Sequence, residues 1–127
     1  MEHVLKMTRE GAEKLLREQM EAGQGLITNV ESARNFQEAF EQFKLEHNKW
    51  EKFVKTALSR IFPEKEKMQE FTECSSVFII TADTDYDLYL EYRGILVKQI
   101  SHLESCIEQL WNAPRQLEGF AGKLMTG

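Results

Sequence analysis

The chain has 127 residues, of which 42% are hydrophobic and 29% charged, and it carries a net charge of -5. This composition is typical of one globular domain, no apolar run is long enough for a membrane span, and the acidic charge argues against a binder of nucleic-acid polymers. Two cysteines are too few for a disulfide framework, so we expect a reduced, cytoplasmic protein.

The first predicted helix runs from about Arg9 to Ala22. Thr8 is suited to cap it, because a threonine oxygen can accept a hydrogen bond from a backbone amide of the first turn. The apolar positions form one narrow face, made of Ala12, Leu15, Leu16 and Met20. Gly23 and Gly25 follow at once, and because glycine commonly stands just beyond a helix end, they predict that the helix stops there.

A second, longer helix is predicted to end near Phe62. Its start is marked by a capping-box pair, Thr28 and Glu31, or by Ser32 as an alternative cap. Residues spaced four and three apart form a heptad stripe: Phe36, Phe40, Phe43, His47, Trp50, Val54, Ala57 and Ile61. We interpret His47, the only polar member, as a hydrogen-bonded histidine between helices. The stripe widens near its C-terminal end, which indicates more than one covering helix there.

Pro63 ends the long helix, and a short helix from Glu64 to Thr72 follows, with Met68 and Phe71 pointing inward. The segment Val77–Ile80 is apolar and β-branched, as in a strand. One strand without a partner makes no sheet, so we expect an extended connector that lies on the helices.

The last long helix is predicted from about Asp85 to Asn112, with Thr84 as its cap. Its stripe consists of Leu88, Tyr92, Leu96, Ile100, Leu103, Ile107 and Leu110. Pro114 is expected to end the helix and the bundle domain, residues 1–114. Residues 115–127 then form either a short docking helix or a linker tail.

These elements predict an all-α fold. Two long heptad helices joined by a compact insert should pack antiparallel as a hairpin, with the shorter helices covering the open side of the bundle.

Catalytic and metal-binding signatures are not evident in the sequence. Asp83, Asp85 and Asp87 resemble the start of a calcium loop, but the glycine and glutamate that such a loop needs are replaced by Leu88 and Gly94. His102 and Cys106 are four apart, yet two ligands do not make a zinc site, and acidic neighbours oppose a nucleophilic Cys106. We therefore expect no enzyme activity, no metal and no cofactor.

Two sets of residues are candidates for binding. The first is a set of apolar side chains expected at the surface as an interface: Phe53, Leu58, Phe62, Trp111, Leu117 and Phe120. The second set would form a nucleotide pocket by stacking and charge, although aromatic residues at this spacing more often belong to a core: Trp50, Tyr89, Tyr92 and Arg93.

The order of motifs resembles a known family. The segments Asn48-Lys49-Trp50-Glu51, Leu58-Ser59-Arg60-Ile61-Phe62 and Ile100–Leu110 are similar to the N-terminal helical domain that precedes TIR-like and other effectors in bacterial antiphage proteins. The resemblance covers residues 10–112. It implies an accessory role in self-association, sensing or partner docking, and it supplies no catalytic residues. No effector domain follows, so we expect either an excised domain or a free-standing relative.

From these observations we expect a non-enzymatic helical interaction module that forms homo-oligomers. The alternatives are a small-ligand sensor or sponge for nucleotides, and a stand-alone inhibitor or adaptor that binds another protein.

Overall fold

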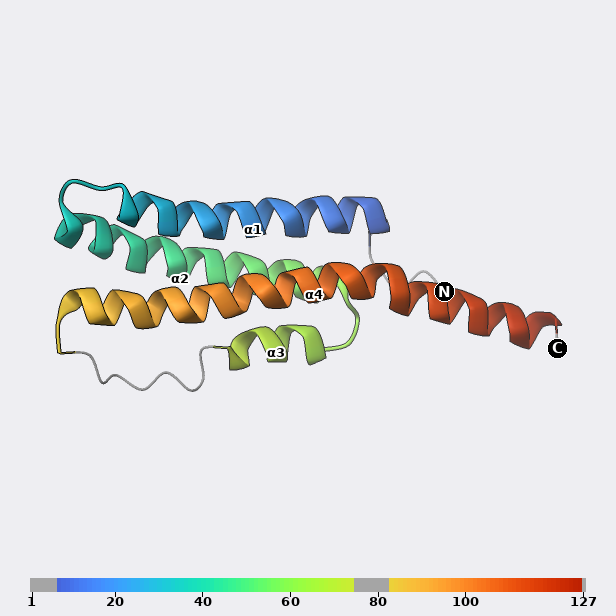
Figure 1. Cartoon of the computed structure of the whole chain (residues 1–127). Helices are drawn as coiled ribbons and strands as arrows, with labels where there is room; N and C mark the ends of the chain where they lie inside the picture. Colours follow the sequence, from blue (N-terminus) through green and yellow to red (C-terminus); the bar gives the residue numbers. More distant parts are fainter. Residues whose placement is uncertain (1–6, 75–82, 127) are drawn as a thin grey trace.

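The computed structural model describes residues 7–74 and 83–126, with side chains described as far as residue 112. Four helices make up this part of the chain, as shown in Figure 1: α1 (Arg9–Glu31), α2 (Phe36–Ile61), α3 (Glu66–Glu73) and α4 (Asp85–Thr126). The predicted all-α class and helical bundle are confirmed. None of the described helices combines the length and the hydrophobicity needed to cross a membrane.

The two long heptad helices, α2 and α4, run side by side in the same direction (Figure 1). The ring of Phe36 at the start of α2 lies 5.8 Å from that of Tyr86 at the start of α4, and further along both helices His47 meets Gln99. The predicted antiparallel hairpin is therefore wrong. The reason lies in the insert: α3 runs back along α2, and the chain enters α4 beside the start of α2 rather than beside its end.

The bundle is completed by α1 on one side of the α2–α4 pair and by α3 on the other side (Figure 1). α1 runs antiparallel to both long helices, because Gln19 bonds to Trp50 of α2, while Glu13 and Glu31 bond to the late Trp111 and the early Tyr89 of α4. The two predicted stripes share one core with α1 and α3, so both end up buried in the same cluster of apolar side chains.

The glycines of α1 do not end the helix. α1 continues through Gly23 and Gly25 to Glu31, and no described glycine has a positive φ, so the predicted stop is wrong. Gly23 is buried where α1 crosses its neighbours. A Cβ atom there would lie 3.1 Å from Cζ2 of Trp50 and 3.2 Å from Cδ1 of Ile100. Glycine is used at this point for close helix approach rather than for termination.

The two glycines should therefore respond differently to alanine. A Cβ at Gly25 meets nothing within 4 Å, so Gly25→Ala is expected to raise the free energy of unfolding by about 0.5–1 kcal/mol through helix propensity. Gly23→Ala should raise the free energy of unfolding by less, because part of the gain in helix propensity is lost in displacing Trp50 and Ile100. Urea unfolding of both variants measures this difference, and equal gains would show that α1 does not approach its neighbours so closely.

Helix caps follow the predictions only in part. The Thr8 side chain accepts from the Gly11 amide at 3.0 Å, and Thr84 accepts from the Asp87 amide at 3.0 Å, so both predicted caps are confirmed. The start of α2 is different. Asn35 caps it by accepting from the amide of Glu38 at 3.1 Å.

The predicted capping box at the start of the second helix is wrong. Thr28 lies inside α1, where its hydroxyl donates to the Gln24 carbonyl, and Ser32 donates to the Thr28 carbonyl as the C-terminal cap of α1. Thr28 and Glu31 belong to the last turns of α1, because this helix continues past Gly23 and Gly25.

The C-terminal half of the chain shows two further differences. The short helix is displaced by one or two residues from the predicted range, with Phe71 fully buried and Met68 half-buried as expected. α4 passes through Pro114 and continues to Thr126, so the predicted helix end is wrong. Proline removes one backbone donor, a cost that a long helix can absorb. The predicted connector at Val77–Ile80 lies outside the described residues.

Candidate functional site

The four residues predicted to form a nucleotide pocket lie in contacts between helices. Trp50 is buried and its indole N–H donates to the Gln19 carbonyl at 2.9 Å, while its ring packs against Phe71. Tyr89 is also buried, and its hydroxyl donates to the Glu31 carboxylate at 3.3 Å. Both aromatic side chains therefore make contacts that join neighbouring helices.

The other two residues of the predicted pocket, Tyr92 and Arg93, also contact neighbouring helices. Tyr92 packs edge-on against Phe40 and Phe43 in the α2–α4 seam. The guanidinium of Arg93 lies 3.2 Å from the carboxylate of Glu31. In the structure these side chains contribute to the packing between α1, α2 and α4, and the nucleotide pocket stays a prediction.

A buried polar chain crosses the seam between α2 and α4. Nε2 of His47 lies 2.8 Å from Oε1 of Gln99, an oxygen that can only accept, so this ring nitrogen carries the proton. The Gln99 amide in turn donates to the Glu51 carboxylate at 2.6 Å. His47 and Gln99 are both buried. The interpretation of His47 as a hydrogen-bonded interface histidine is confirmed.

His102 and Cys106 contact each other, and His102 also contacts α3. Nε2 of His102 donates to the Lys67 carbonyl at 3.1 Å, and the Cys106 sulfur lies 3.6 Å from the same nitrogen. Burial raises the pKa of the Cys106 thiol to about 12, which opposes thiolate chemistry. Among the side chains that the structure describes, in residues 7–74 and 83–112, no three His, Cys, Asp or Glu are grouped as a metal site requires.

Two buried acidic protons make stability sensitive to alkaline pH. Burial raises the pKa of Tyr89 from 10.0 to about 12, and that of Cys106 from 9.0 to about 12. Between about pH 9 and pH 12 the unfolded chain releases these protons while the folded chain keeps them, so the free energy of unfolding should fall as pH rises. Urea unfolding at pH 8 and pH 11 should show that the free energy of unfolding falls less for Tyr89→Phe than for the wild type. An equal fall in both proteins would contradict the assignment of this effect to Tyr89.

The predicted interface residues fall into different environments. Phe53 is 50% exposed, and Trp111 is half-buried with its N–H donated to Glu13 and Arg9 over its ring. Leu58 and Phe62 are buried, so their assignment to the surface is wrong; they belong to the core at the end of α2, the part of the bundle that α3 covers. The side chains of Leu117 and Phe120 lie outside the described residues.

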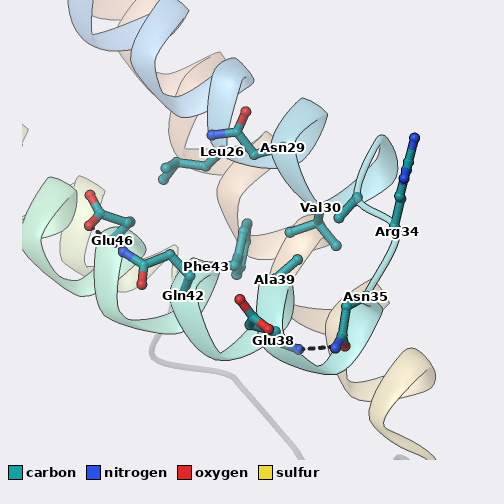
Figure 2. Close-up of a pocket in the computed structure, with 11 residues that line it drawn as sticks. Leu26, Asn29, Val30, Arg34, Asn35, Glu38, Ala39, Gln42, Phe43 and Glu46 are labelled. Carbon is teal, nitrogen blue, oxygen red and sulfur yellow. Dashed lines mark hydrogen bonds between the residues drawn. The ribbon is translucent and has the colours of Figure 1, made fainter.

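An open pocket of about 420 Å³ lies between the end of α1 and the start of α2 (Figure 2). Leu26 and Val30 of α1 and Phe43 of α2 give it an apolar floor, and Glu38 and Glu46 stand along its α2 side. Arg34 points away from the other lining residues in Figure 2. We refer to this pocket as the α1–α2 groove. An apolar floor with a polar rim suits an apolar side chain that brings a positive charge with it.

A line of side chains leads from the α1–α2 groove along the outside of α2. Its members are three or four residues apart, which places them on one side of the helix, and we refer to them as the α2 face: Glu38, Gln42, Glu46, Lys49, Phe53, Thr56 and Arg60. The first half is acidic, and the second half is basic and carries the exposed Phe53. The spacing and the charge pattern of the α2 face are readable in the sequence, on a different side of the helix from the heptad stripe.

Comparison of the chain with protein-family models, with curated proteins and with solved structures gave no significant match. The resemblance to the helical domains of antiphage proteins therefore stays a prediction.

Proposed function

We propose that this chain is a non-catalytic helical module that functions by associating with copies of itself. One observation carries the proposal. Among the side chains that the structure describes, five large apolar ones are exposed, and all five lie on the two long helices, α2 and α4: Leu45, Phe53, Tyr86, Leu90 and Val97.

The distribution of these residues matters more than their number. Single exposed apolar side chains are common on soluble proteins, whereas apolar residues gathered along helix faces mark surfaces that are covered by a partner. The heptad positions of α2 and α4 lie in the core or pack against it, so the exposed residues are additional to those needed for folding.

The experiment is a measurement of molar mass against concentration. Light scattering of the full chain between 1 and 100 µM should give a mass above the 14.9 kDa of one chain, rising toward a plateau. A mass of one chain throughout this range would overturn the proposal. Binding of a different protein by a chain that stays monomeric would favour the adaptor alternative instead.

A further inference from the structure

We infer that two copies of the chain pair antiparallel through their α2 faces, each placing Phe53 in the α1–α2 groove of the other. This inference rests on the proposed self-association and names the surface and the residue that carry it. The site is incomplete in one copy, because the groove and the side chain that fills it belong to different chains.

The first argument is the separation of Phe53 from its own groove. Phe53 lies eleven residues beyond Gln42 along α2, which corresponds to about 16 Å of a straight helix. It therefore cannot reach the groove of its own chain, although both lie on the same side of α2. A two-fold axis between Glu46 and Lys49 brings Phe53 of each copy opposite Gln42 of the other, directly over the apolar floor formed by Phe43 and Val30.

The second argument is charge complementarity. The same two-fold axis places Lys49 of each copy opposite Glu46 of the other, and Arg60 near the other copy's Glu38. Glu38 makes no ion pair among the described residues, and the contact of Lys49 with Glu46 in its own chain is long, at 4.0 Å. A face that is acidic in one half and basic in the other is complementary to itself only in the antiparallel direction.

The third argument is access. On α1, the small and exposed Ala22 lies one turn before the groove residue Leu26. Leu45 is 59% exposed, one turn before Lys49 and close to the proposed axis. A second helix can therefore approach here without displacing large side chains, and its approach would cover Leu45 as well as Phe53. The exposed residues of α4 are not among those that line the α1–α2 groove, so the pairing is assigned to the α2 face alone.

The inference is tested by comparing two matched variants, Phe53→Glu and Val97→Glu. Both residues are about half exposed, at 50% and 46%, and each lies on a long helix, α2 for Phe53 and α4 for Val97. Sedimentation velocity should show association weakened at least about a hundredfold by Phe53→Glu, because two symmetric aromatic contacts are lost and two charges enter apolar grooves. Val97→Glu should associate like the wild type. Circular dichroism verifies that both variants fold.

The outcomes separate the inference from the proposed function. If the wild type associates and Val97→Glu disrupts association while Phe53→Glu does not, self-association stands and the α2 face is the wrong surface. If neither variant has an effect, the inference is also overturned. A monomeric wild type removes the proposed function itself.

A charge exchange gives an independent measurement. Glu46→Lys and Lys49→Glu should each weaken association by about tenfold, since each change places like charges opposite one another at both symmetric contacts. The double variant restores opposite charges across the axis and should recover near wild-type association. A double variant as weak as either single variant would contradict the antiparallel register.

Discussion

Replacing Trp50 with alanine is expected to lower the free energy of unfolding by about 3–5 kcal/mol, a large share of the stability of a small domain. Trp50 is 6% exposed and lies where α1, α2 and α3 meet. Its ring packs against Phe71, its Cζ2 faces Gly23, and its N–H bonds to the Gln19 carbonyl. Because Gly23 has no side chain that could move into the space, truncation of Trp50 should leave a cavity.

The second tryptophan provides the control. Trp111 is half-buried, and it donates a hydrogen bond to Glu13 at the edge of the bundle. Because solvent already reaches Trp111, Trp111→Ala should cost clearly less than Trp50→Ala. Urea unfolding followed by circular dichroism, which needs no tryptophan signal, measures both variants. Equal losses would mean that Trp50 is not at the centre of the packing.

Removing Gln99 is the second change with a large expected effect. Gln99→Ala deletes the link between His47 and Glu51, leaving a buried histidine N–H without its acceptor and a space in the α2–α4 seam. An unsatisfied buried donor and a small cavity together should cost about 2–4 kcal/mol of unfolding free energy.

A double variant distinguishes the hydrogen bond from simple loss of volume. Replacing His47 and Gln99 together with leucine removes donor and acceptor at once, so its cost should be less than the summed costs of the two single leucine variants. Additive costs would show that the two side chains act independently, against the 2.8 Å contact between them.

The sequence predicted the helices well and their arrangement poorly. Periodicity located α2 and its buried stripe because the spacing of apolar residues depends only on local helix geometry. The end of α1 was misplaced because Gly23 can serve either as a helix stop or as a point of close approach, and only the positions of Trp50 and Ile100 decide between them.

Local sequence patterns also do not determine whether α4 runs parallel or antiparallel to α2. A heptad stripe is the same for parallel and antiparallel neighbours, and the insert between α2 and α4 is long enough to return the chain to the start of α2. Leu58 and Phe62 are core residues at the end of α2, and which of the apolar residues that flank a stripe become buried depends on where the other helices pack. The α2 face can be recognised in the sequence from its charge pattern. The α1–α2 groove cannot, because it forms only where α1 packs against α2.

The parallel arrangement of α2 and α4 decides which side chains are buried and which face outward, and it can be measured directly by pulsed electron paramagnetic resonance. With Cys74 and Cys106 replaced, spin labels are placed at exposed Gln37 and Asp87 in one variant, and at exposed Ser59 and Asp87 in another. Parallel helices predict that the Ser59–Asp87 distance is clearly the longer of the two, because it includes the roughly 30 Å of α2 between Gln37 and Ser59. A shorter distance for Ser59 and Asp87 would show the antiparallel hairpin and contradict the arrangement described here.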